Sequence, residues 1–131
     1  NDGHFYFQYF NFLDHDLEVK KGDIIAFYHG NKILIKRVIA SASDWVYIDN
    51  DGNVNVNGEL LNENYAQNKI LGNSDIEFPL QVQDNKWFVL SDKRDITIDS
   101  RNSEIGCISN DDVIGKIIFR VWPLKKIGSV N

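Results

Sequence analysis

The sequence predicts an all-β fold, either a sandwich or a partly open barrel of short antiparallel strands with very little helix. Short runs of β-branched and aromatic residues recur along the chain, and turns rich in glycine, asparagine and aspartate separate them. Helical periodicity is almost absent. The 131 residues suffice for one domain with a core but not for two ordinary domains. We therefore expect a single domain over residues 1–131.

The first half of the chain contains three predicted strands. Residues 4–12 are aromatic on both faces, as in a core strand, but aromatic side chains with polar tips are also typical of a membrane interface. Strands at 24–28 and 33–39 follow, and glycine and asparagine in residues 29–32 supply the positive φ angles of a hairpin. The strand at 33–39 therefore has an antiparallel neighbour.

The second half continues in the same way. Further strands are expected at residues 45–48, 54–56, 76–82, 86–90 and 116–122. Residues 49–53 resemble a calcium loop in composition, but the glycine is misplaced and no glutamate closes the loop, so we interpret them as a turn. Residues 59–75 are polar and irregular, with a helical turn near Leu61. Residues 110–112 resemble the cap of a very short helix that ends at Gly115.

Lys36 interrupts the apolar run 33–39, whose composition is typical of a strand buried on both faces. Burying an ammonium without a partner costs several kcal/mol, so this lysine needs a counter-ion, extends to water or loses its proton. A neutral lysine amine next to a serine hydroxyl acts as a general base, as in a Ser/Lys dyad. The run by itself favours a surface lysine on an edge strand, and the dyad is the alternative.

A second cluster, residues 91–101, follows the predicted strand 86–90 and is dense in aspartate and arginine. Such residues form bidentate pairs that hold a loop in place. Composition alone favours a solvated charged loop. The alternative is a rigid platform beside an active site.

Composition excludes several classes of function. A net charge of −5 without a basic cluster argues against a nucleic-acid surface. The single cysteine, Cys107, allows no internal disulfide and argues against a thiolate metal site, so we expect neither metal nor cofactor. No apolar run reaches the length of a transmembrane helix, and the chain lacks a signal peptide and an initial methionine, so we expect an excised part of a longer protein.

Five sequence blocks resemble, in order, the type I signal peptidases, which are the membrane-anchored Ser/Lys peptidases of bacteria. The blocks are residues 20–27, 35–39, 51–58, 91–101 and 115–123. Each block is weak alone, but five in order at compatible spacing make a specific signal over nearly the whole chain. The compact stretch between Asn57 and Lys86 resembles the Gram-positive branch of this family. The resemblance implies a folded sheet like that of the signal peptidases.

The resemblance also implies roles for individual residues. Lys36 falls on the general base, and Thr97 falls on a serine position whose hydroxyl orients the lysine amine. Asp99 and Arg101 fall on a charged pair that supports the active site.

Further positions match the family around these residues. Asp92 and Arg94 fall on a Gly-Asp-Asn-Arg motif and, with Arg37, are expected to support the active site. Leu34 and Ile35 fall on the strand that pairs with the extended substrate and lines a pocket for alanine-like side chains.

The chain departs from the family pattern in several places. Ser91 replaces the glycine of the Gly-Asp-Asn-Arg motif, Lys93 replaces its asparagine, and Thr97 replaces serine. In the family the nucleophilic serine belongs to a Ser-Met-x-Pro-Thr-like motif, which we expect upstream of Asn1. No serine in the chain has that motif around it, so the fragment alone is expected to be inactive.

The implied function is that of a serine endopeptidase domain that cleaves signal peptides after small side chains. Its expected partners are the extended signal-peptide region of secreted preproteins and the membrane surface. Its expected place is the outer face of the cell membrane, held by an N-terminal anchor outside this chain. The alternative is a non-catalytic or specialised homologue that binds extended peptides or pilin-like subunits by β-augmentation and assists pilus or surface-protein assembly. The retained Lys36 favours the enzyme, whereas the divergence around Ser91 and Thr97 supports the alternative.

Overall fold

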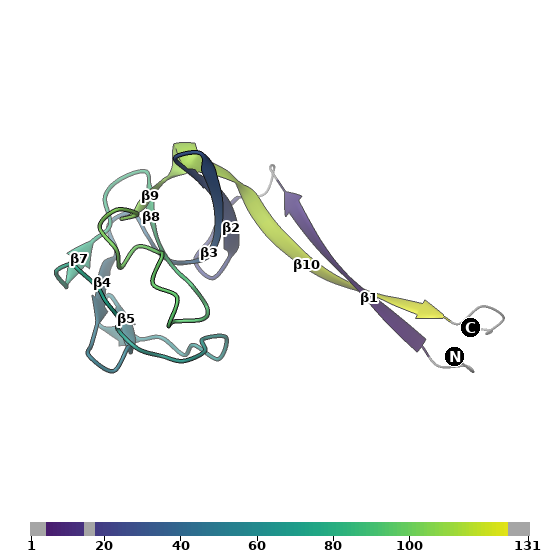
Figure 1. Ribbon diagram of the computed structural model, residues 1–131, viewed down its shortest axis with the longest axis horizontal. Helices are drawn as coiled ribbons and strands as arrows, with labels where there is room; N and C mark the ends of the chain where they lie inside the picture. Colours follow the sequence, from purple (N-terminus) through teal and green to yellow (C-terminus); the bar gives the residue numbers. More distant parts are fainter. Residues whose placement is uncertain (1–4, 15–17, 126–131) are drawn as a thin grey trace.

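The computed structural model describes residues 5–14 and 18–125, and the side chains of residues 18–118. Over these residues it is almost entirely β, as predicted, with one short 3₁₀ helix (Figure 1). The elements are β1 (Phe5–Asp14), β2 (Ile24–His29), β3 (Lys32–Ser41), β4 (Trp45–Ile48), β5 (Val54–Val56), β6 (Glu59–Leu60), β7 (Leu80–Gln81), β8 (Lys86–Leu90), β9 (Ile108–Ser109), η1 (Asn110–Asp112) and β10 (Val113–Lys125). None of the described helices is both long and apolar enough to cross a membrane.

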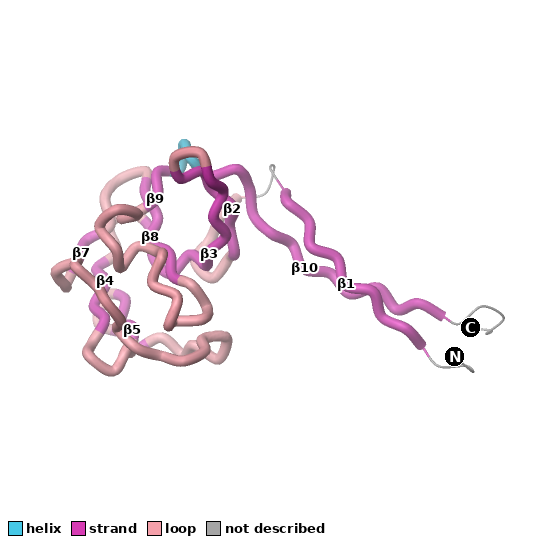
Figure 2. Tube along the Cα trace, viewed as in Figure 1, coloured by secondary structure: helices cyan, strands magenta, loops and turns pink. Residues whose placement is uncertain are grey.

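The strands form two antiparallel sheets. The larger sheet has the order β1-β10-β2-β3-β8-β9, and the smaller has the order β6-β5-β4-β7. Figures 1 and 2 show that β1 and β10 extend away from the body as a two-stranded arm. The side chains of β1 lie outside the described residues, so the membrane contact predicted for residues 4–12 stays a prediction.

β8 is buried on both faces because its alternate side chains enter two different hydrophobic clusters. Phe88 and Leu90 belong to a cluster with β4 and β5, whereas Val89 belongs to a cluster with β2 and β9. All three side chains are at most 1% exposed. This double burial fixes the position of the strand end, after which the chain enters residues 91–101.

β3 differs from the prediction, because only its second half is buried. Ile33 and Ile35 are 57% and 56% exposed, whereas Val38 is completely buried. The reason is the pairing of β3. All of β3 up to Arg37 pairs with β2, but β8 pairs only with the part of β3 from Arg37 onward. Among the residues that the structure describes, the first half of β3 therefore has a free edge on the side of β8.

Two other expectations for the middle of the chain were wrong in detail. The strand expected at 76–82 is reduced to β7, since Pro79 has no N–H to donate to a sheet. The polar stretch 59–75 begins with the short strand β6, and the structure describes no helical turn near Leu61. Residues 49–53 form the expected turn, in which the Asp49 carboxylate accepts hydrogen bonds from backbone N–H groups.

The short helix also differs from the prediction. Residues 110–112 are the helix η1 itself, and Ser109 is its cap, with its hydroxyl accepting from Asp111 N at 3.2 Å. Gly115 does not end the helix but lies in β10, next to an irregularity in the pairing with β2.

Candidate active site

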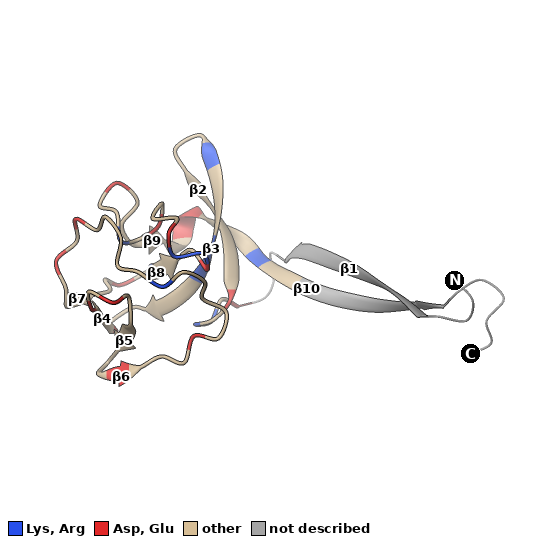
Figure 3. Ribbon diagram, turned by 60° about the horizontal axis from the view of Figure 1, so that its bottom comes forward, with Lys and Arg blue, Asp and Glu red and all other residues tan. Residues whose placement is uncertain are grey.

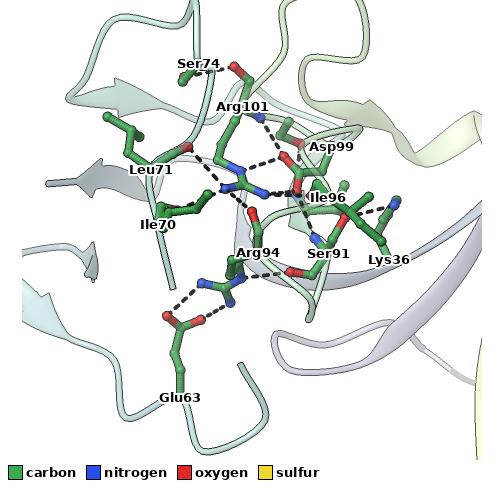
Figure 4. Close-up of polar contacts among 12 residues, drawn as sticks. Lys36, Glu63, Ile70, Leu71, Ser74, Ser91, Arg94, Ile96, Asp99 and Arg101 are labelled. Atoms are coloured by element: carbon green, nitrogen blue, oxygen red, sulfur yellow. Dashed lines mark hydrogen bonds and ion pairs between the residues drawn. The ribbon is translucent and has the colours of Figure 1, made fainter. Parts of the chain in front are cut away.

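The register of the larger sheet brings Lys36 and Ser91 together. Arg37 pairs with Leu90 in the antiparallel ladder between β3 and β8, so the residue before Arg37 faces the residue after Leu90. Residues opposite each other in such a ladder have neighbouring side chains. The Lys36 amine accordingly donates a hydrogen bond to Ser91 Oγ, with an Nζ to Oγ distance of 2.8 Å (Figure 4). A lysine amine and a serine hydroxyl, 55 residues apart in the chain, are thus in direct contact.

The surroundings of Lys36 favour its neutral form. Burial lowers the pKa of the amine below the ordinary value of 10.5. The charge of Asp99 opposes this change, and the charge of Arg101 adds to it. More of this lysine is therefore neutral near pH 8 than of an exposed lysine, as a general base requires.

Two buried charged residues hold the backbone of Ser91. Its N–H donates to Asp99 Oδ2 at 2.9 Å, and its carbonyl accepts from Arg94 Nε at 2.8 Å. Asp99 and Arg94 are 0% and 1% exposed. Ser91 itself is only 6% exposed, so its hydroxyl is held in one place beside Lys36.

Asp99 and Arg101 form a buried pair, as the resemblance implies. Arg101 Nε and Nη2 donate to the two carboxylate oxygens of Asp99 at 3.0 and 2.8 Å. The Arg101 guanidinium also donates to four backbone carbonyls, those of Ile70, Leu71, Arg94 and Ile96 (Figure 4). Residues 91–101 are therefore a rigid platform tied to neighbouring segments. The interpretation as a solvated loop was wrong, although Lys93 and Asp95 are exposed.

Asp92 and Arg94 do not pair with each other. Asp92 accepts two hydrogen bonds of 2.7 Å from the guanidinium of Arg37. Arg94 instead forms a buried pair with Glu63, in which each guanidinium Nη donates to a different carboxylate oxygen. Figure 3 shows lysine and arginine segments beside β3 and β8, with acidic segments among them.

Glu63 and Tyr65 are site residues that the sequence did not indicate. The Tyr65 hydroxyl donates to Glu63 Oε2 at 3.0 Å, and burial raises the pKa of Tyr65 to about 12. The Arg37 guanidinium lies over the Tyr65 ring, 4.0 Å from its centroid. Backbone hydrogen bonds from Gln67 to Asp92 and from Arg94 to Gln67 join the same segment to the platform. The one available signal was Arg94 itself, because a buried arginine requires a carboxylate.

Thr97 was expected to orient the Lys36 amine, and this role stays a prediction. Among the described residues the hydroxyl bonded to Lys36 is that of Ser91, and no hydrogen bond joins Lys36 to Thr97. The Thr97 methyl group packs against Gly72, where an added Cβ would lie 2.6 Å from it.

Leu34 and Ile35, the expected substrate-binding residues, lie on the free half of β3. Leu34 is partly buried against the hydrophobic cluster that contains Val89, whereas Ile35 is exposed. The platform also carries two exposed apolar side chains, those of Ile96 and Ile98, which are 42% and 54% exposed. An unpaired strand edge with apolar residues near it can accept an extended peptide as an additional strand.

Known proteins resemble the chain in sequence and in fold. The family described as signal peptidase, peptidase S26, matches residues 7–122. Signal peptidase I P of Bacillus subtilis subsp. natto is 31% identical over 88% of this chain and 66% of its own length. Signal peptidase IB of Staphylococcus aureus is 32% identical over 82% of this chain and 63% of its own length. Thylakoidal processing peptidase 1 of Arabidopsis thaliana is 33% identical over 76% of this chain.

The chain covers only part of the length of each of these relatives. The chain spans 28% of the Arabidopsis protein, 66% of the Bacillus protein and 63% of the Staphylococcus protein. A crystal structure of a signal peptidase I from Enterococcus faecalis has the same fold, with a TM-score of 0.65 over 78% of this chain and 98% of that chain, at 24% identity.

Proposed function

Because this chain belongs to the signal peptidase family, peptidase S26, we propose that it is the catalytic part of a serine endopeptidase that cleaves signal peptides from exported proteins with a Ser/Lys dyad. The observation that carries the proposal is the half-buried Lys36 amine, which has a lowered pKa and is bonded to a serine hydroxyl on a rigid platform. The enzyme acts on the outer face of the cell membrane, held there by an anchor that precedes this chain.

In this proposal Lys36 is the general base and a serine upstream of Asn1 is the nucleophile. The serine hydroxyl attacks the carbonyl carbon of the scissile peptide bond, and Lys36 Nζ takes its proton. The C–N bond then breaks, the Lys36 ammonium returns the proton to the leaving amine, and an acyl ester remains. Water, deprotonated by the same amine, hydrolyses the ester and regenerates the serine.

The substrate is the extended region of a signal peptide, bound along the free half of β3. Backbone groups of this edge pair with the peptide, and Leu34 and Ile35 contact its small side chains. Hydrogen bonds hold the platform beside β3 in place. The residues that make these bonds are Arg37, Asp92, Arg94, Asp99 and Arg101.

Lys36→Arg tests the proposal in the full-length protein that contains this chain. The guanidinium of arginine stays protonated, so cleavage of a signal-peptide substrate is expected to fall by at least about 10²-fold. Lys20→Arg is the matched control, because Lys20 is an exposed lysine outside β3 and outside the platform, and its activity is expected to stay at the wild-type level. Full activity of the Lys36→Arg variant would exclude the dyad.

A second candidate is a specialised homologue that binds extended peptides or pilin-like subunits without cleaving them. The free edge of β3 supports it, since strand addition needs no chemistry. A full-length protein that binds a signal-peptide substrate but leaves it intact at every pH would favour this candidate over the peptidase.

A further inference from the structure

The amine of Lys36 has a partner that the family pattern does not provide. The family motif has glycine where this chain has Ser91, so the side chain that contacts the amine is a feature of this chain. We propose that Ser91 is the positioning residue that orients the Lys36 amine for proton transfer, an inference that rests on the proposed function.

Lys36 and Ser91 face each other across the end of the β3–β8 ladder, and the amine donates to the hydroxyl at 2.8 Å. A neutral amine has two N–H groups and one lone pair, so holding one N–H limits rotation about the Cε–Nζ bond. The lone pair then keeps one direction, as a general base requires.

The backbone of Ser91 is held rigidly on both sides. Asp99 and Arg94 bind the backbone N–H and the carbonyl of Ser91, and each of them belongs to a buried ion pair. The backbone that carries the hydroxyl is therefore fixed in position, whereas the backbone of a residue on a mobile loop would not be.

The side chain that accepts from the Lys36 amine is uncharged. Both oxygens of Asp99 already accept hydrogen bonds from Arg101 and Ser91, so the carboxylate is not bonded to the Lys36 amine. The amine donates instead to the uncharged hydroxyl of Ser91. It orients the amine without adding the negative charge that would raise its pKa.

Thr97 falls on the orienting position of the family. Its methyl group packs against Gly72, and Lys36 is bonded to Ser91 instead. The proposal therefore predicts that the hydroxyl of Ser91 matters more than the hydroxyl of Thr97.

Three substitutions in the full-length protein test the proposal. Ser91→Ala is expected to lower kcat about 10²-fold with little change in KM, because the base loses its orientation. The loss is expected to persist at high pH, since it does not come from protonation of Lys36. Ser91→Thr keeps a hydroxyl and is expected to restore most of the activity, and Thr97→Val is expected to have the smaller effect.

The outcomes separate this proposal from the proposed function. If wild type is active and Ser91→Ala keeps full activity, or recovers it simply by raising the pH, the proposal is wrong while the peptidase stands. Loss in Thr97→Val with full activity in Ser91→Ala would assign the role to Thr97. If wild type is inactive, the peptidase fails, and the orientation of Lys36 is decided by NMR.

The NMR measurement uses the same full-length protein with labelled lysine. A hydrogen bond that holds the amine also restricts the motion of the end of the side chain, so the NMR order parameter of the Lys36 Cε group is expected to be high in wild type and to fall in Ser91→Ala. An order parameter that stays unchanged in Ser91→Ala would overturn the proposal regardless of activity. Thermal unfolding of each variant checks that the fold is retained.

Discussion

The buried pair of Glu63 and Arg94 offers a sharp test of how the platform is held. The Glu63 side chain is 0% exposed and that of Arg94 is 2% exposed. Glu63→Ala would leave the Arg94 guanidinium in the interior without its carboxylate and the Tyr65 hydroxyl without its acceptor. Removing one partner of a buried ion pair costs about 3–5 kcal/mol.

This loss is large compared with the stability of a small domain. The free energy of unfolding is typically about 5–15 kcal/mol, so Glu63→Ala is expected to remove a large share of it. For a chain of this size the melting temperature is expected to fall by roughly 10–20 °C. Urea unfolding followed by tryptophan fluorescence measures the change in free energy.

Two further variants make the test specific. Glu59→Ala removes an exposed glutamate of β6 and is expected to change stability by less than about 0.5 kcal/mol. Replacing both partners, by Glu63→Leu with Arg94→Met, removes the unpaired charge and is expected to recover part of the loss. A cost below about 1 kcal/mol for Glu63→Ala would refute the role assigned to this pair.

Three other predictions concern pH, packing and reactivity. The pKa of Lys36 is lower in the folded state than the value of 10.5 expected for the unfolded chain. Between these two pKa values the unfolded chain binds more protons than the folded chain, so the free energy of unfolding rises with pH. Urea unfolding across this pH range should show a weaker dependence of this free energy on pH in Lys36→Met than in wild type. Gly72→Ala is expected to cost about 2–4 kcal/mol of stability, because φ is +72° and the new Cβ would lie 2.6 Å from the Thr97 methyl group. Gly58→Ala is the control, with φ +84° and open space around it, and should cost only about 1–2 kcal/mol. Equal costs in urea unfolding would contradict the crowding at Gly72. Burial raises the pKa of the Cys107 thiol to about 11, so iodoacetamide at pH 8 should alkylate it about 10²-fold more slowly than a free thiol, and a similar rate would contradict its burial.

Elements with strong local signals could be predicted from the order of residues alone. The strand at 86–90 was predicted with its observed bounds, and so was the strand at 45–48. Gly30 has the positive φ angle expected for the hairpin between β2 and β3. These features depend on side chains and turns that are close in sequence, so their pattern is visible without the fold.

The sequence also indicated the residues of the platform through the family resemblance. Lys36, Asp99 and Arg101 do lie together in the structure, around Ser91. Their roles in catalysis remain proposals that the variants above test.

Which groups meet across long distances in the chain became visible only in the folded molecule. The exposure of Ile35 depends on where β8 stops pairing with β3, and composition does not encode that limit. Arg94 lies 31 residues from Glu63, and Ser91 lies 55 residues from Lys36. Such pairs depend on the strand register and on the path of a long irregular segment. Burial over the whole molecule sets both of them. A buried charge or hydroxyl needs a partner, and the residue that provides it can lie anywhere in the sequence.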